Sequence, residues 1–324
     1  MNAEYAGFFD IGMVQRNEDD AIVVHGTMCL IRRAAMVEAG NWSSDTICED
    51  TDLGLTIAEN GWKTHYTSKR YGYGLLPDTF EAFKKQRHRW AYGGFQIIKK
   101  HWRRFLPAQS RLTTAQRRHF LLGWISWLGA ESVGALVAVA SLAFVPFVLI
   151  LGISVPAHVL TLPILATFLL YALHFVSLYK MRVATTPLRM LGAALAASAV
   201  QFTVAKAVLD GFRYKDLAFA RTAKGKNWLA GAAHHFPALP EAVIGGALFF
   251  CGLIMLMTNW HDIREIQLYG FALMVQSLPF VCAAFIGFVE PTRLNDFATW
   301  QALGTRLAAV PRRLGLSSRA AMVE

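Results

Sequence analysis

Charged residues are scarce in this chain of 324 amino acids, at 17% of the total against 54% hydrophobic residues. Soluble domains carry about a quarter charged residues. The hydrophobic residues concentrate after about residue 119, in uncharged runs long enough to cross a bilayer. This composition excludes an ordinary soluble protein and predicts a multi-pass membrane protein embedded in a lipid bilayer.

Cysteine is also scarce. The four cysteines form no C-x-x-C pair, so the sequence predicts neither a disulfide framework nor a zinc site. The N-terminus lacks the basic stretch and long apolar core of a signal peptide, and the first third is therefore expected to be cytoplasmic. The net charge is +10. The basic residues lie beside the predicted spans and form no single stripe, which favours cytoplasmic loops over nucleic-acid binding.

The first hundred residues read as alternating strands and helices, which is typical of an α/β fold. Trp62, Thr64 and Tyr66 alternate with Lys63 and His65, the period of a strand. The expected elements are strands at 21–24, 27–31 and 62–66, and helices at 34–39, 50–60 and from 78 onward, the last opened by a capping box of Asp78 and Glu81.

The whole chain is expected to divide at changes in hydropathy and charge. The expected divisions are a partial cytoplasmic domain at 1–100, interfacial helices at 101–129, two transmembrane helices within 130–179, a cytoplasmic interfacial helix and loop at 180–240, two further transmembrane helices within 241–289, and a basic cytoplasmic tail at 290–324. The apolar stretch 190–209 is ambiguous. As a span it would put the basic segment 210–240 outside, so we interpret it as interfacial or half-inserted.

Two adjacent carboxylates, Glu49 and Asp50, stand at the start of a predicted helix. Acidic residues commonly stabilise that end of a helix without any catalytic role. The functional alternative is a general base that takes the proton of an attacking sugar hydroxyl. Asp50-Thr51-Asp52 also reads as a metal-binding D-x-D, but the polar, turn-like segment before it argues against this reading. The sequence predicts no metal ligands.

A second motif is Gln86-Arg87-His88-Arg89-Trp90. Guanidinium groups can bind a diphosphate in bidentate fashion, and an indole can stack on a sugar ring. A basic amphipathic helix beside a membrane explains the same residues without catalysis. A third segment carries Phe219, Arg221, Thr222 and Lys224, and is either a basic juxtamembrane loop or a mobile loop that contacts a nucleotide phosphate.

Together, in this order, the three motifs resemble those of the processive family 2 glycosyltransferases, which include bacterial cellulose synthase and related β-glucan synthases. Cys48-Glu49-Asp50 resembles the family's T-E-D, with Cys in place of Thr. Residues 86–90 match Q-x-x-R-W, and Phe219, Thr222 and Lys224 match the gating loop F-x-V-T-x-K, with Arg221 in place of Val. His25-Gly26-Thr27 falls where the family has an acceptor-contact motif. The resemblance runs from about residue 5 to about residue 290.

The resemblance implies an inverting, processive hexosyltransferase in a bacterial inner membrane. Its donor would be a UDP-sugar, with UDP-glucose expected, and its acceptor a growing β-glucan-type chain. By resemblance, Asp50 is the base and Glu49 its neighbour, while Gln86, Arg87, Arg89, Thr222 and Lys224 bind the donor. His25, Gly26, Thr27 and Trp90 contact the acceptor. A divalent ion, Mg²⁺ or Mn²⁺, assists the departure of UDP.

The fold implied by the resemblance is the acceptor-side half of a GT-A-type domain, followed by a helical membrane region. The donor-nucleotide half, with its own D-x-D and the metal ligands, is not found in the sequence. The chain is therefore expected to be inactive alone. The alternatives are a catalytically inactive membrane subunit or gene relic that scaffolds a polysaccharide synthase, and a plain transporter. A transporter predicts ionisable residues deep in the spans, where few occur.

Overall fold

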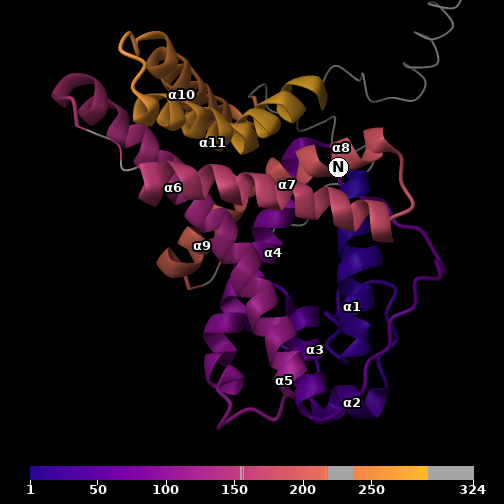
Figure 1. Cartoon of the computed structure of the whole chain (residues 1–324). Helices are drawn as coiled ribbons and strands as arrows, with labels where there is room; N and C mark the ends of the chain where they lie inside the picture. Colours follow the sequence, from indigo (N-terminus) through magenta and orange to yellow (C-terminus); the bar gives the residue numbers. More distant parts are fainter. Residues whose placement is uncertain (154, 156, 216, 218–235, 291–324) are drawn as a thin grey trace, which may run out of the picture.

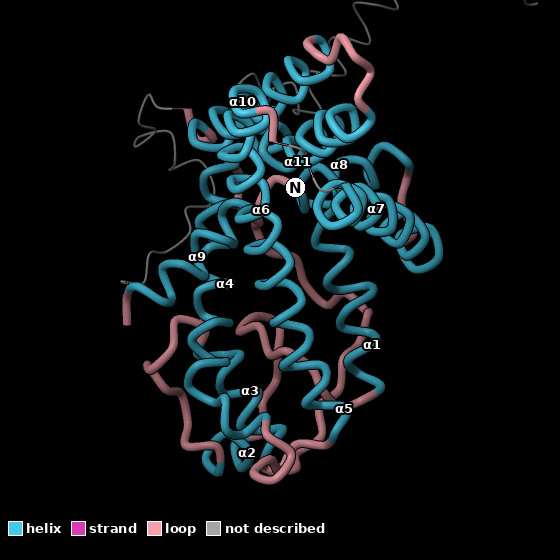
Figure 2. The backbone as a smooth tube through the Cα atoms, turned by 60° about the vertical axis from the view of Figure 1, so that its left-hand side comes forward, coloured by secondary structure: helices cyan, strands magenta, loops and turns pink. Residues whose placement is uncertain are grey.

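A computed structural model describes residues 1–153, 155, 157–215, 217 and 236–290. Short helices and irregular segments make up its lower part in Figure 1, and long apolar helices make up its upper part. Helix α4 (Phe80–His101) and helix α6 (Gly123–Leu151) run between the two parts. Figure 2, turned by 60°, shows the same separation.

The first 122 residues, which include α4, form most of the lower part, but the N-terminus itself lies beside α8 (Pro187–Ser198) in the upper part (Figure 1). Besides α4, these residues contain η1 (Asn2–Glu4), η2 (Gly7–Gly12), α1 (Met13–Glu18), α2 (Arg33–Glu38), α3 (Glu49–Glu59), η3 (Trp102–Phe105), α5 (Thr114–Arg117) and η4 (Arg118–Leu122). The helices predicted at 34–39 and 50–60 therefore appear as α2 and α3. Within the interfacial segment predicted at 101–129, only short helices precede the long α6 helix.

The predicted strands are not observed: the described part of the chain contains no β-strand, as Figure 2 shows. Residues 21–24, 27–31 and 62–66 lie outside helices but form no ladder. The alternation behind the third prediction persists, because Lys63 and His65 are exposed while Trp62, Thr64 and Tyr66 are half-buried. A strand also requires a hydrogen-bonded neighbour, which the alternation of side chains cannot supply. The α/β half of the expected fold is thus not observed.

The upper part contains η5 (Ala157–Thr161), α7 (Leu162–Arg182), α8 (Pro187–Ser198), α9 (Gln201–Arg213), α10 (Leu239–Met257) and α11 (Arg264–Val289). Five described segments are long and apolar enough to cross a membrane: Thr114–Leu151, Ala157–Arg182, Pro187–Arg213, Leu239–Met257 and Arg264–Val289. The chain therefore has the build of a multi-pass membrane protein. Four of these segments overlap the stretches 130–179 and 241–289, in which the sequence predicts four spans.

The fifth apolar segment covers 190–209, which the sequence predicts to be interfacial. It consists of two helices, α8 and α9, separated by a turn at Ala199 and Val200. Its composition suits a span, whereas the basic segment after it favours an interfacial position. The interfacial interpretation stays a prediction. The basic tail predicted after residue 290 lies outside the described residues.

Helix α4 is the element around which both parts assemble. The hydroxyl of Thr79 accepts a hydrogen bond from the backbone N–H of Ala82 at 3.1 Å and caps the helix. The predicted cap of Asp78 with Glu81 was therefore wrong by one residue. Lys99, Lys100 and His101 occupy the last turn, where positive charge favours the helix dipole.

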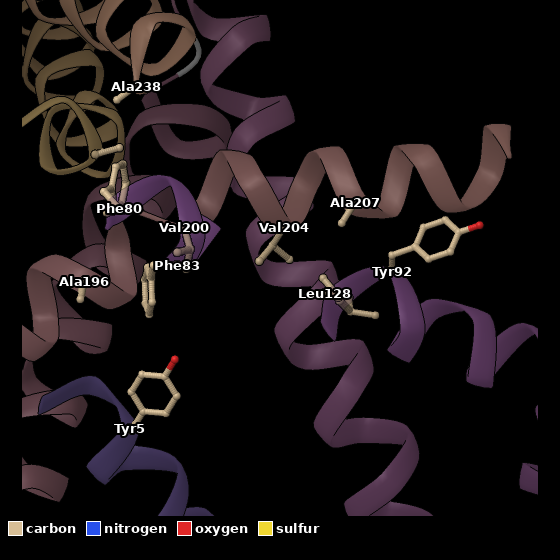
Figure 3. Packing of buried hydrophobic residues seen from close by; sticks show 13 residues of the cluster. Tyr5, Phe80, Phe83, Tyr92, Leu128, Ala196, Val200, Val204, Ala207 and Ala238 are labelled. Carbon is tan, nitrogen blue, oxygen red and sulfur yellow. The ribbon is translucent and has the colours of Figure 1, made fainter. Parts of the chain in front are cut away.

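The core around α4 joins five helices, α4, α6, α8, α9 and α11, to the N-terminus. Phe80 and Phe83 of α4 are fully buried, and Val204 of α9 packs in the same cluster with Val200 from the turn just before that helix. Tyr5 from the N-terminal segment lies on the other side of Phe83, as Figure 3 shows. Burial of large apolar side chains stabilises a fold by about 1.5–3 kcal/mol each. This core fixes α4 against both the membrane helices and the first residues of the chain.

Candidate active site

The start of α3 carries three carboxylates in its first turn, Glu49, Asp50 and Asp52, with Cys48 at the N-cap position. Negative charge is favourable there because the helix dipole is positive at this end. The three side chains nevertheless lie in different surroundings, so stabilisation of the helix end does not account equally well for all of them.

Asp50 lies directly against the predicted acceptor-contact motif. Gly26 has a φ of +63°, and a Cβ on it would come within 2.7 Å of Asp50 Oδ2. Asp50 Oδ1 accepts a hydrogen bond of 2.7 Å from the backbone N–H of Thr51. Burial raises the pKa of Asp50 above its ordinary value, opposed by the Thr51 hydrogen bond and reinforced by the Glu49 charge. A desolvated carboxylate whose pKa is raised is a stronger base than an exposed one.

Glu49 faces elsewhere. It lines an open pocket of about 660 Å³, whose other lining residues are Trp42, Ser43, Ser44, Asp45, Thr46, Ile47, Gln96 and Leu217. The two adjacent carboxylates therefore serve different environments. Glu49 acts on Asp50 through its charge.

Asp52 is a structural residue. It is buried and receives hydrogen bonds from His101 Nε2 at 2.5 Å and Lys100 Nζ at 2.8 Å. Burial alone would raise the pKa of Asp52, but these two partners lower it. Asp52 is thus committed to α4 while Asp50 faces Gly26, and the interpretation that the pair is not a D-x-D metal site stays a prediction. The described residues contain no group of three or more His, Cys, Asp or Glu that could hold a metal ion.

The second motif lies on α4, where two of its side chains are buried against the N-terminal segment. The Tyr5 hydroxyl donates a hydrogen bond to Gln86 Oε1, and Arg87 forms an ion pair with Glu4. Trp90 is half-buried, with its ring 6.2 Å from that of Tyr5 in an edge-to-face arrangement. No motif indicated Glu4 and Tyr5, because they lie more than eighty residues from their partners.

The remaining cation of the motif, Arg89, is half-buried and lies near the start of α3. The Cys48 thiol lies 3.7 Å from the Arg89 backbone carbonyl oxygen. A Cβ on Gly93, one turn later, would lie 2.4 Å from Cys48 Sγ. Burial raises the pKa of Cys48 to about 12, so the thiol is neutral and no nucleophile. Cys48 thus acts as the packing contact between the two motifs.

Side-chain contacts connect the motif on α4 with the motif at the start of α3 by way of the N-terminal segment. Trp90 touches Tyr5, and Phe9 of the same N-terminal segment lies 5.4 Å from the His25 ring. Gly26, next to His25, lies against Asp50, and Cys48, two residues before Asp50, contacts the backbone of Arg89 on α4. Contacts through the N-terminal segment and Cys48 therefore link His25 and Gly26, Asp50 and Trp90, which come from three separate segments. That Asp50 and Trp90 open into a single cleft stays a prediction.

The third motif, with Thr222 and Lys224, lies outside the described residues. The segment just before it is anchored to α4, because Lys215 O accepts hydrogen bonds from Tyr92 Oη at 3.1 Å and Gln96 Nε2 at 3.3 Å. Neither residue was singled out in the sequence. Gln96 follows Gly93 at helical spacing, so the α4 face that contacts Cys48 could have indicated it.

The sequence matches the family described as glycosyl transferase family group 2 over residues 5–286. This chain belongs to that family. The resemblance predicted from the motifs is therefore confirmed. The matched region includes the starts of α3 and α4, and it extends through α10 and nearly to the end of α11.

Among similar proteins are plant enzymes named for glucomannan synthesis. The chain is 40% identical over 76 residues to probable glucomannan 4-beta-mannosyltransferase 9 of Oryza sativa subsp. japonica and to glucomannan 4-beta-mannosyltransferase 2 of Arabidopsis thaliana. It is 38% identical over 76 residues to probable glucomannan 4-beta-mannosyltransferase 11 of Arabidopsis thaliana. Each match covers 24% of this chain and 14–17% of the relative. The chain is thus similar to a minor part of each relative's length.

Proposed function

We propose that this chain forms the acceptor side of a membrane-bound, inverting glycosyltransferase that extends a β-linked hexose polymer. The observation that carries the proposal is the desolvated Asp50 carboxylate held against Gly26 at the start of α3. In the proposed step, an acceptor hydroxyl attacks the anomeric carbon of the donor as Asp50 takes its proton. The bond from that carbon to the phosphate oxygen breaks, and the nucleoside diphosphate leaves with the electron pair.

Binding roles follow from the surroundings of each side chain. Trp90 offers a flat apolar ring to a sugar of the acceptor, and His25, Gly26 and Thr27 contact the acceptor beside Asp50. Arg89 is the α4 cation that we assign to the donor diphosphate, since guanidinium groups bind such anions in bidentate fashion. Thr222 and Lys224 are proposed to close over the donor nucleotide.

The donor is proposed to be a nucleotide-activated hexose. The resemblance of the motifs to those of β-glucan synthases predicts UDP-glucose as the donor and a β-glucan as the product. The names of the similar plant proteins instead point to transfer of mannose. Either sugar fits the same step, since both present an anomeric carbon bonded to a diphosphate. We therefore propose nucleotide-activated glucose and nucleotide-activated mannose as the two candidate donors, and analysis of the product distinguishes between them.

Two further parts of the proposal concern the divalent ion and the side of the membrane on which the lower part lies. A divalent ion, Mg²⁺ or Mn²⁺, is expected to accompany the donor diphosphate, but the described residues offer it no ligand cluster, and we route no step through it. The lower part in Figure 1 is proposed to lie in the cytoplasm, because basic residues flank the apolar helices on the segments that join it. A bacterial inner membrane, which the motif resemblance suggested, finds no support in the plant relatives.

The test is a transfer assay in membranes that contain the chain joined to, or co-expressed with, a donor-binding half of the same family. Radiolabelled UDP-glucose and nucleotide-activated mannose are supplied separately, and the product is digested with linkage-specific hydrolases. A labelled β-linked polymer supports the proposal and names the sugar. No incorporation from either donor, in membranes where a known synthase is active, would favour the inactive scaffolding subunit.

A further inference from the structure

The Arg87 guanidinium lies among three aromatic rings. Its central carbon is 4.7 Å from the ring centroid of Tyr5, 4.9 Å from that of Phe83 and 4.6 Å from that of Trp90. Arg87 also forms its ion pair with Glu4, and its side chain is only 7% exposed. A cation enclosed by ring faces is attracted to their negative electrostatic potential, most strongly to that of Trp.

This environment does not suit a ligand of a donor diphosphate. A buried charge is tolerated only when it is paired, and removing one partner leaves the other uncompensated. Arg87 already has Glu4, and turning toward a diphosphate would strand that carboxylate and vacate the ring contacts. Burial already raises the pKa of Glu4 against the opposing charge of Arg87. Arg89, on another face of the helix, remains half-buried and close to the start of α3.

The same contacts restrain the indole of Trp90. One turn of α4 separates Arg87 from Trp90, so the guanidinium can lie over the indole. The Tyr5 ring meets the indole edge-on at 6.2 Å, and the Tyr5 hydroxyl is itself fixed by Gln86. Glu4 and Tyr5 both come from the N-terminal segment, which thereby ties α4 from one side. A stacking platform needs a fixed ring plane, because a rotating ring loses part of its contact with a sugar.

We infer that Arg87 is a positioning residue, which with Glu4 holds the indole of Trp90 for a glycan acceptor and does not bind the donor diphosphate. The inference rests on the proposed function for the identity of the ligand. The arrangement of Glu4, Arg87 and Trp90 itself does not depend on it. Two readouts are therefore needed, one with a glycan and one without.

The first readout is the environment of Trp90 in the purified full chain in detergent. The fluorescence of Trp90 is taken as the difference between the chain and Trp90→Phe, and its quenching by acrylamide is measured. Arg87→Gln is expected to increase quenching of that component, and Arg87→Lys to increase it less. Lys85→Gln is the matched control, because Lys85 lies on the same helix, is exposed and pairs with Glu81 at 2.7 Å. Unchanged quenching in Arg87→Gln overturns the inference.

The second readout is ligand binding by the same proteins, with a β-1,4-linked hexasaccharide of glucose or mannose and, separately, uridine or guanosine diphosphate. Arg87→Gln is expected to weaken hexasaccharide binding about tenfold while leaving diphosphate binding within about twofold. Loss of diphosphate binding with hexasaccharide binding intact would instead identify Arg87 as a donor ligand and overturn the inference. If the unaltered chain binds neither ligand, the proposed function fails, and the quenching result alone decides the positioning role.

Folding of each variant is checked by gel filtration and thermal unfolding. Should Arg87→Gln fail to fold, Glu4→Gln replaces it, since this variant keeps the guanidinium and removes only its partner. Glu4→Gln combined with Arg87→Gln is expected to have less effect than the sum of the two single changes, because both act on one interaction. Full additivity would show that Glu4 and Arg87 act separately and would contradict the inference.

Discussion

The start of α3 and the first half of α4 both carry charged motifs, and the side chains of the two motifs are partnered differently. At α3, Asp50 meets Thr51 and the Gly26 turn, and Glu49 lines an open pocket. At α4, Arg87 and Gln86 are buried and matched by Glu4 and Tyr5. The comparison shows that some charged side chains of a motif remain able to meet a ligand, whereas others are paired within the protein and hold the site in shape. Which role a charged side chain has depends on whether a partner from outside the motif lies next to it.

The largest effect is expected where the charge is available. Asp50→Asn keeps the shape of the side chain and removes the base, so transfer should fall by at least about 100-fold. Incorporation of radiolabelled hexose, with the donor-binding half supplied, measures it. Because burial raises the pKa of Asp50, ionised Asp50 costs the folded state stability at neutral pH, and the thermal midpoint should not fall. Asp45→Asn is the control, as Asp45 is exposed and pairs with Lys100 at 3.0 Å. Activity within about threefold of the unaltered protein in Asp50→Asn would remove it from the role of base.

The next effect concerns the approach of Gly26 to Asp50. Gly26→Ala adds a Cβ that would lie 2.7 Å from Asp50 Oδ2 and displaces the carboxylate. A displacement of about 1 Å can lower a rate by about 100-fold, so kcat should fall. Gly40→Ala has a comparable positive φ of +87° with nothing within 4 Å of the added Cβ, and it isolates the cost of backbone strain. Equal losses of kcat in the two variants would show that contact with Asp50 plays no part.

The contact between the two helices can be disturbed without touching a charge. Gly93→Ala puts a Cβ 2.4 Å from Cys48 Sγ, and overpacking of this kind costs about 1–3 kcal/mol. The thermal midpoint of the purified chain should therefore fall. Cys48→Ala in the same protein should restore part of it, because the Cβ of residue 48 still lies 2.8 Å from the new Cβ. Gly129→Ala, in a helix with nothing within 4 Å of the new Cβ, should be neutral or stabilising. A midpoint unchanged by Gly93→Ala would mean that α3 and α4 are not in contact here.

The smallest effect is on pH dependence. Transfer requires Asp50 to be deprotonated, so activity should fall as the pH drops through its raised pKa. Glu49→Gln removes a negative charge that helps to raise that pKa, and the acid limb of the pH–rate profile should move to lower pH. Glu59→Gln, at the other end of α3 and paired with Arg104 at 2.7 Å, should leave the limb in place. A limb that moves equally in both variants would exclude a local charge effect.

The extent to which sequence predicted this molecule follows from the range of the interactions. Helices α2 and α3, the helical region of α4 and four apolar spans were predicted because their signals are local in periodicity, composition and end residues. The strand at 62–66 was wrong because pairing depends on a neighbour that a period of two does not reveal. In the candidate site, Asp50 and Gly26 were indicated by the motifs, and their roles stay predictions. Glu4 and Tyr5 were not, since nothing in their local sequence identifies partners eighty residues away.

The central claim is that the start of α3 and Trp90 of α4 border one acceptor site. Photo-crosslinking tests it most directly, using the purified chain and a β-1,4-linked hexasaccharide that carries a diazirine at its non-reducing end, with labelled peptides located by mass spectrometry. The account predicts labels both in the peptide around Asp50 or Gly26 and in the peptide around Trp90, each suppressed by excess unlabelled hexasaccharide. Labels confined to one of these peptides, or unaffected by the competitor, would contradict it.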